Sequence, residues 1–403
     1  MANVNNIKDM TNNYRYYILT LINIFYIYYL KLFNSMRNLK TLLFLLLIIN
    51  QSYSQSIRNS LKKSESLIVK KVLKNLKKYE VQILLTEIKE KKNKFKLKRK
   101  KLLVNNNNYF YPASTIKLPI ALLTIEKINK NPKLNLNSSF IIEGDNNVTT
   151  FKKEILNLFV LSSNESYNRL FEFLGQDYIN SKLREKGFKD FRISHRLSTI
   201  NSDNLKTKEI KFYNDVELVH IQKSICNKPL NKLKLKKLIK GDGFFKDNKL
   251  INKSMNFSHK NYFSIKDLND IIISLFFPNV LKNKKFDLSK IQLEFIKHSM
   301  STTTSNLGYS NNEYPDNYTK FFILGDRDEM INEMIYNKVG NAYGYSIDNA
   351  YIYNKKSDRH FILTASIYTN ENNILNDNIY EYDEIGIPFL SEIGIILTNH
   401  KFK

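Results

Sequence analysis

The order of strand-like and helix-like segments restricts the fold of this chain most strongly. Segments rich in β-branched and aromatic residues lie near both ends, at 81–85, 95–104, 334–338, 345–353 and 361–368. Between them, apolar residues recur at helical spacing in 151–161, 167–174, 265–277 and 289–298, and again after the last strand in 384–398. This order predicts an α/β (α+β) fold: an antiparallel sheet built from both chain ends and flanked by helices, with an inserted all-α lobe.

The same pattern suggests domain boundaries. Residues 56–403 are expected to form one catalytic domain, with a sheet lobe at 56–110 and 331–403 and a helical lobe at 111–330. Residues 56–78 have helical spacing and predict an amphipathic opening helix. At 403 residues and 42% apolar content, the chain is long enough to bury a substantial core.

The charge of the chain is strongly basic. It has 63 basic and 38 acidic residues, a net charge of +25, which would attract nucleic acid, anionic lipid or an acidic polymer. Its densest basic run, 91–101, is interleaved with Phe95 and Leu97, as in a solvated strand pair, and a polyanion-binding face is the alternative. Because Lys, Asn, Ile and Tyr are abundant throughout, the charge carries little functional weight.

Cysteine and histidine usage bears on cofactors. Cys226 is the sole cysteine, so the chain has no internal disulfide and no cysteine-based zinc cluster. No two of the six histidines lie three to five residues apart. We therefore expect no metal and no cofactor.

The N-terminal region resembles a targeting segment. Apolar stretches at 16–30 and 42–49 are shorter than the roughly 20 residues of a spanning helix. The stretch at 42–49 is preceded by a short basic region that begins at Met36 and is followed by small residues. This order is typical of a secretory signal peptide. We interpret 1–35 as an upstream extension and 36–54 as the signal peptide, with a two-helix membrane hairpin as the alternative. The mature product would be secreted or periplasmic, without a stable membrane anchor.

A serine and a lysine three residues apart, Ser114 and Lys117, begin an apolar segment that runs from 118 to 125. On a helix, residues three apart share a face, so a lysine amine with a lowered pKa could take the proton of the serine hydroxyl. An apolar helix is expected to be buried, and burial would lower the lysine pKa. By itself, Ser-x-x-Lys also arises by chance in a lysine-rich chain.

Two further patterns follow in order. Ser162-Ser163-Asn164 comes at the end of an apolar helical segment, and Lys338-Val339-Gly340 comes at the end of a strand. Together the three patterns resemble the Ser-x-x-Lys, Ser-x-Asn and Lys-Thr-Gly motifs of serine β-lactamases and penicillin-binding proteins, specifically the class A-like branch. The resemblance covers about residues 60–403.

The resemblance implies a role for each matching residue. Ser114 would attack a carbonyl to form an acyl-enzyme, with Lys117 as its base, and Ser162 would pass a proton to the leaving nitrogen. Asn164 would hydrogen-bond the substrate or the lysine, and Lys338 would attract a substrate carboxylate. The oxyanion hole would comprise the N–H groups of Ser114 and of a residue after Gly340, most simply Ala342.

Two departures from the family pattern bear on activity. Val339 replaces the usual hydroxyl residue of the third motif. Class A enzymes activate the deacylating water with a glutamate two residues after an arginine, and the matching loop has Arg196 but Ser198. Asp203 could substitute only with a shifted loop, and His195 is expected to hold the loop rather than to catalyse.

The resemblance therefore implies an exported serine hydrolase that is acylated by β-lactams or related amides and hydrolyses them. A penicillin-binding, D,D-peptidase-like protein or a catalytically weak cell-wall-binding relative is the alternative. A nucleic-acid-binding protein would rest on charge alone. Expected partners are thus small β-lactam or cell-wall peptide substrates.

Overall fold

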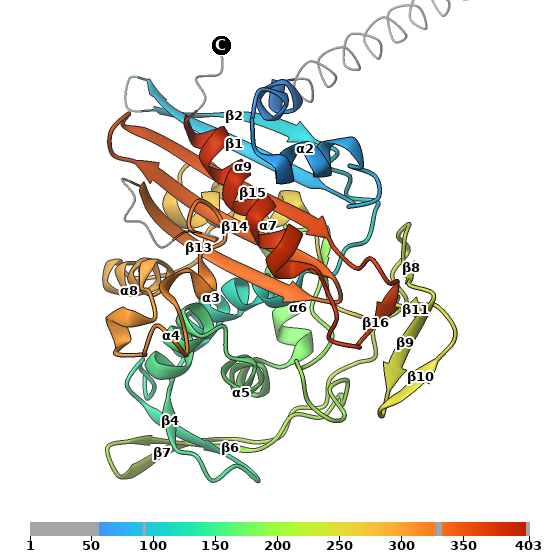
Figure 1. The fold of residues 1–403 in the computed structure, drawn as a ribbon. Coiled ribbons are helices and arrows are strands. Elements are labelled where there is room, and N and C mark those ends of the chain that lie inside the picture. Colours follow the sequence, from blue (N-terminus) through green and yellow to red (C-terminus); the bar gives the residue numbers. More distant parts are fainter. Residues whose placement is uncertain (1–55, 92–93, 326, 328–332, 400–403) are drawn as a thin grey trace, which may run out of the picture. The chain divides into compact units, whose positions relative to one another are not determined.

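Five long strands form the central antiparallel sheet (Figure 1). The computed structural model describes residues 56–91, 94–325, 327 and 333–399. Across the sheet the order is β13–β14–β15–β1–β2. The strands are β1 (Gln82–Lys91), β2 (Lys94–Leu102), β13 (Glu333–Ala342), β14 (Tyr345–Asn354) and β15 (Arg359–Tyr368). Both chain ends contribute strands, so the predicted fold class is confirmed.

Both faces of this sheet are buried, because its strands carry apolar residues on alternate sides. On one face, Ile83, Leu363 and Ala365 belong to a cluster that includes residues of α2 (Leu67–Lys74) and α9 (Ile387–Asn399). On the other face, Leu84 and Ile362 belong to the larger cluster shared with the inserted helices. Figure 1 shows α9 and α2 across the first face.

Most expected helices are present. The inserted and neighbouring helices are α3 (Lys117–Ile128), α4 (Phe151–Val160), α5 (Asn164–Leu174), α6 (Gln176–Glu185), α7 (Ile265–Phe276) and α8 (Lys290–Ser301). Hydroxyl side chains of Thr150, Ser163, Ser264 and Ser289 cap α4, α5, α7 and α8. The expected helix at 56–78 is interrupted: residues 56–62 are helical, and α2 starts anew after its N-cap Ser66.

The inserted lobe contains short strands as well as helices, which the prediction of an all-α lobe did not include. One four-stranded sheet has the order β4–β3–β6–β7. The short strands of the lobe are β3 (Ser139–Ile142), β4 (Thr149–Thr150), β5 (Phe191–Arg192), β6 (Ile210–Asn214), β7 (Glu217–Gln222), β8 (Ile239–Lys240), β9 (Gly243–Lys246), β10 (Lys249–Ile251), β11 (Met255–Asn256) and β12 (Tyr262–Phe263). A further short strand, β16 (Ile374–Leu375), comes from the C-terminal part of the chain and pairs with β9. Strands of two to six residues are too short for a clear two-residue period.

The N-terminal predictions, an extension at 1–35 and a signal peptide at 36–54, lie outside the described residues. Within the described ranges, no helix has the length and apolar character needed to cross a bilayer.

Candidate active site

The Ser-x-x-Lys pair lies where a short 3₁₀ turn becomes a buried helix. Ser114 lies in the turn Ala113–Ile116, and Lys117 is the first residue of α3. All of α3 except Lys127 is buried, including Lys117. Lys117 Nζ is 2.8 Å from Ser114 Oγ, so the helical spacing does bring amine and hydroxyl together.

The second motif completes the surroundings of this amine. Lys117 Nζ donates to Asn164 Oδ1 at 2.7 Å and to the carbonyl oxygen of Ser162. From β13, Lys338 Nζ donates to Ser162 Oγ at 2.8 Å. The structure therefore gathers the five polar side chains singled out in the three motifs, Ser114, Lys117, Ser162, Asn164 and Lys338, into one hydrogen-bonded group.

Burial lowers the pKa of both lysines. It lowers the pKa of Lys117 well below its ordinary value, and the neighbouring charge of Lys338 lowers it further. Burial and the charge of Lys320 lower the pKa of Lys338 to about 7, an effect that Asp348 opposes. Asp348 accepts hydrogen bonds from Phe322 N at 3.0 Å and from the Asn337 amide, and its own pKa is raised by burial to about 6. Lys320 and Asp348, which sequence patterns did not reveal, thus influence the charge of Lys338.

Gly340 allows β13 to lie against the turn that carries Ser114. A Cβ atom added at residue 340 would come 2.5 Å from Ser114 N and 2.9 Å from Ala113 Cβ. Such distances are below any normal contact, so the close approach requires glycine.

The hairpin between β13 and β14 decides which backbone N–H faces Ser114. Ala342 pairs with Tyr345 across a two-residue turn, Tyr343–Gly344, whose φ angles of 51° and 79° are both positive. Residues that close such a turn exchange both hydrogen bonds, so the N–H of Ala342 is committed to β14. The N–H of Asn341, one residue earlier, points away from β14. If this strand supplies an oxyanion donor, the register therefore favours the N–H of Asn341 over that of Ala342, and the turn chemistry around Gly344 was the signal that could have indicated it.

In addition to Tyr343 in the turn, three residues within or in contact with the motifs have left-handed backbone conformations. Their φ angles are 46° at Ala113, 51° at Ser162 and 47° at Ser198. Such conformations cost about 1–3 kcal/mol each and persist only where surrounding structure enforces them. Ala113 and Ser162 lie beside or within the motifs, and Ser198 lies in the loop that contacts Asn164.

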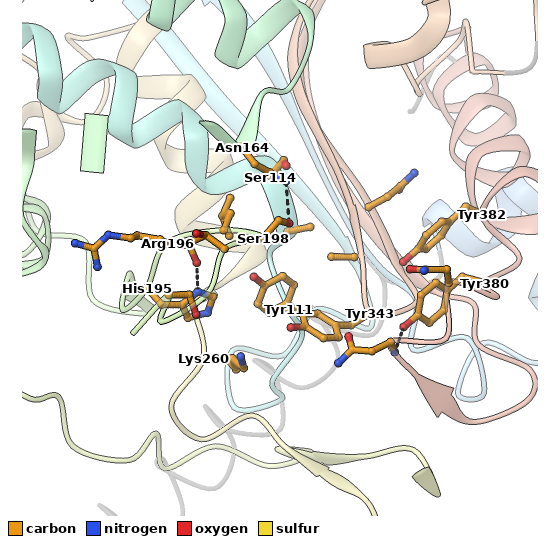
Figure 2. Close-up of a pocket in the computed structure, with 18 residues that line it drawn as sticks. Tyr111, Ser114, Asn164, His195, Arg196, Ser198, Lys260, Tyr343, Tyr380 and Tyr382 are labelled. Atoms are coloured by element: carbon orange, nitrogen blue, oxygen red, sulfur yellow. Dashed lines mark hydrogen bonds between the residues drawn. The ribbon is translucent and has the colours of Figure 1, made fainter. Parts of the chain in front are cut away.

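Two cavities adjoin Ser114. The first, here named the Ser162 cavity, has a volume of about 380 Å³ and is lined by Ser114, Ser162, Gly340 and residues of 315–325. The second, here named the tyrosine cavity, has a volume of about 500 Å³ and is lined by Ser114, Asn164 and Asn341, by the 195–202 loop and by four tyrosines. In Figure 2, His195 and Lys260 lie on one side of the tyrosine cavity and Tyr380 and Tyr382 on the other. Ser114 therefore lies between two binding spaces.

The loop expected to carry a catalytic glutamate has none at the predicted position. Ser198 Oγ accepts a hydrogen bond from Asn164 Nδ2 at 3.0 Å. Arg196 instead holds the loop, because its guanidinium forms a buried bidentate pair with Glu172, with Nη2 to Oε2 at 3.0 Å. Asp203 is exposed and does not line either cavity.

His195 is buried next to this loop. Burial lowers its pKa to about 4, and its ring lies parallel to that of Tyr111 with centroids 6.4 Å apart. Its Nε2 accepts a hydrogen bond from Asn261 N at 3.4 Å, and its Nδ1 is 2.5 Å from the Arg196 carbonyl oxygen. These contacts fit a neutral imidazole that holds the loop. In the described part of the chain, no three His, Cys, Asp or Glu residues form a group that could hold a metal ion.

Comparisons with known proteins agree with the fold. Residues 68–260 match the model of the β-lactamase enzyme family. A crystal structure of a TLA-1 extended-spectrum β-lactamase variant superposes with a TM-score of 0.50, covering 86% of this chain and 97% of the other at 12% identity. The TLA-3 extended-spectrum β-lactamase gives a TM-score of 0.50, covering 85% of this chain and 98% of the other at 13% identity.

At such identities the superpositions establish the fold alone. No curated protein matches the chain by sequence. The family match spans the first two motifs, from Ser114 to Asn164, and ends before Lys338. The chain therefore has the fold of the serine β-lactamases and penicillin-binding proteins, and its residues 68–260 match the β-lactamase enzyme family.

Proposed function

We propose that this protein is an exported serine enzyme whose Ser114 is acylated by β-lactams or related amides, and that it hydrolyses the acyl-enzyme slowly. The observation that carries the proposal is the 2.8 Å contact between Lys117 Nζ and Ser114 Oγ inside a buried polar group. A nucleophile needs an adjacent base that is neutral before reaction, and a buried lysine with a lowered pKa meets that need.

Either form of the Lys117 amine can make its three short contacts, and burial favours the neutral one. A neutral amine has two N–H donors and one lone pair. The Asn164 side chain and the Ser162 carbonyl oxygen accept from both donors. The remaining lone pair then faces Ser114 Oγ, so the serine hydroxyl would donate its proton to Nζ as Oγ bonds to the carbonyl carbon.

The remaining steps of acylation follow from the surrounding groups. The N–H groups of Ser114 and Asn341 would stabilise the negative oxygen of the tetrahedral intermediate. When the C–N bond breaks, Ser162 would give its proton to the leaving nitrogen and regain one from Lys338 or Lys117, both within 3.4 Å of its hydroxyl oxygen. Lys338 would also attract a carboxylate on the leaving-group side.

Release of the acyl group is the slow step in this proposal. Deacylation needs a base for water, and Ser198 offers a neutral hydroxyl where the family has a carboxylate. The hydroxyl of Ser198 in place of a carboxylate favours a second candidate function, that of a penicillin-binding protein that retains the adduct. Val339, which is buried and has no hydroxyl, removes one contact expected for a penicillin carboxylate and would lower affinity.

Export is part of the proposal because of the apolar stretch that follows Met36. The test is the intact mass of protein recovered from the periplasm or medium of an expressing cell. A chain that begins shortly after residue 54 would support signal cleavage, and a chain that keeps Met1 would refute it.

Mass spectrometry after incubation with benzylpenicillin tests acylation. We expect one adduct per chain, lost in Ser114→Ala, formed orders of magnitude more slowly in Lys117→Ala, and retained in Ser181→Ala, a control at an exposed serine. A long-lived adduct would indicate a penicillin-binding protein, and a transient one a β-lactamase. If the wild-type protein forms no adduct, or if Ser114→Ala still does, the proposed function is wrong.

A further inference from the structure

The two cavities beside Ser114 differ in what they can bind, and this inference rests on the proposed function. In that mechanism, Ser162 and Lys338 deliver a proton to the leaving nitrogen, so the leaving group must lie in the Ser162 cavity. The acyl part of the substrate, on the other side of the scissile bond, must then extend into the tyrosine cavity. The lining of the tyrosine cavity therefore selects the acyl group.

Neutral polar side chains line most of the tyrosine cavity. Four tyrosines and four asparagines contribute, namely Tyr111, Tyr343, Tyr380, Tyr382, Asn164, Asn341, Asn376 and Asn378. Tyr380 and Tyr382 have oxygens that already accept backbone N–H groups, at 2.7 and 2.9 Å, so their hydroxyl protons can be donated to a ligand. Such a surface suits amide and hydroxyl groups.

Two cations also line this cavity, and no aspartate or glutamate does. Arg196 is neutralised by its bidentate pair with Glu172. Lys260 Nζ has no hydrogen bond or ion pair with any side chain in the described ranges. Asp203 acts on it electrostatically, but burial has the larger effect and lowers the Lys260 pKa.

An ammonium that loses water without gaining a partner destabilises the folded chain. Such a cost is common where a side chain serves binding rather than stability. Lys260 shares its cavity with Ser114 and lies on the side opposite Tyr380 and Tyr382 (Figure 2). An anionic group of a bound substrate would supply the missing partner.

We infer that Lys260 binds a carboxylate on the acyl portion of the substrate, so the natural substrate is a peptide-like amide with a carboxylate on each side of its scissile bond. Lys338 attracts the leaving-group carboxylate, and Lys260 donates to the acyl-side carboxylate. The tyrosine hydroxyls and asparagine amides bind the polar groups between that carboxylate and the carbonyl carbon.

Benzylpenicillin and its α-carboxy derivative are a matched pair of probes, because they differ by one carboxylate on the acyl side. For each protein, the second-order acylation rate constant of the α-carboxy compound is divided by that of benzylpenicillin. We expect this ratio to be about tenfold larger in wild type than in Lys260→Gln. Lys260→Arg keeps the charge and should retain most of the preference. Lys253→Gln, an equal charge change at an exposed lysine, should leave the ratio unchanged. An equal ratio in wild type and Lys260→Gln would overturn the inference.

Stability separates a binding role from a structural one. Because Lys260 Nζ makes no hydrogen bond or ion pair within the described residues and burial outweighs the pull of Asp203, Lys260→Gln should melt at the same or a higher temperature than wild type. A clear fall in Tm would mean that Lys260 supports the fold, and would overturn the inference.

Equilibrium binding separates this inference from the proposed function. If neither penicillin acylates Ser114, the proposed function fails, and calorimetry with the α-carboxy compound and the Ser114→Ala variant still tests Lys260. Binding that weakens about tenfold in Ser114→Ala/Lys260→Gln supports the inference. Absent binding, or equal binding by the two variants, overturns it.

Discussion

Replacing Gly340 with alanine tests whether the contact between β13 and the Ser114 turn controls acylation. The added methyl group would lie 2.5 Å from Ser114 N, where a normal carbon contact needs about 3.5 Å. The strand and the turn must therefore separate by about 1 Å. Both sides of this contact are backbone or a Cβ atom, so no flexible side chain can absorb the change.

We expect this separation to reduce the acylation rate constant about 100-fold, the usual effect of a 1 Å misplacement at a reacting group. Overpacking should also cost about 1–3 kcal/mol of stability. Adduct formation with benzylpenicillin, followed by mass spectrometry at several times, measures the first effect, and thermal unfolding measures the second.

Gly187→Ala is the matched control for Gly340→Ala. Gly187 has a φ of 76°, and no atom lies within 4 Å of an added Cβ. Its replacement strains the backbone but displaces nothing, so stability should fall while the acylation rate of folded protein stays the same. A folded Gly340→Ala protein that acylates within about threefold of wild type would refute the proposed geometry.

Three further predictions concern charge. Burial and the charge of Lys320 lower the pKa of Lys338 to about 7, so its positive form is lost as pH rises and acylation should decline through neutral pH. Lys338→Arg should move this decline to higher pH in a pH–rate profile. A profile identical to that of wild type would contradict the role of Lys338. Ser198→Glu should shorten the adduct lifetime at least tenfold by supplying a base for water, and an unchanged lifetime in the mass-spectrometric time course would count against that position. Glu172→Gln leaves a buried Arg196 without its anion and should cost about 3–5 kcal/mol in denaturant unfolding, so a loss below 1 kcal/mol would show that the pair is dispensable.

The parts of the fold and site that depend on local spacing could be predicted from the sequence. Ser114 and Lys117 are three residues apart on one helical face, so their contact follows from helix geometry. The long strands near the C-terminus carry β-branched and aromatic residues, and hydroxyl caps precede most helices. These signals are strong because each lies within a few residues.

The remaining features depend on contacts between distant segments. The partner of Arg196 is Glu172 on α5, and the charge state of Lys338 depends on Lys320 and Asp348. No periodicity indicates such pairs, because the fold brings the residues together. Which backbone N–H of β13 faces Ser114 depends on the register of the β13–β14 pair, because a shift of one residue exchanges Ala342 for Asn341. The two-residue turn sets that register.

The sheet order also determines when the site can exist. Strand β1 pairs with β15, and Lys338 reaches Ser162 from β13, so Ser114 is synthesised long before the strand that completes its surroundings. Pairings between distant parts of a chain form slowly, since a long loop must close first. A nascent or truncated chain that ends before β13 would carry Ser114 without Lys338, Gly340 or the Asn341 N–H. Such a fragment should be chemically silent, so activity would appear only after the last strands have joined the sheet.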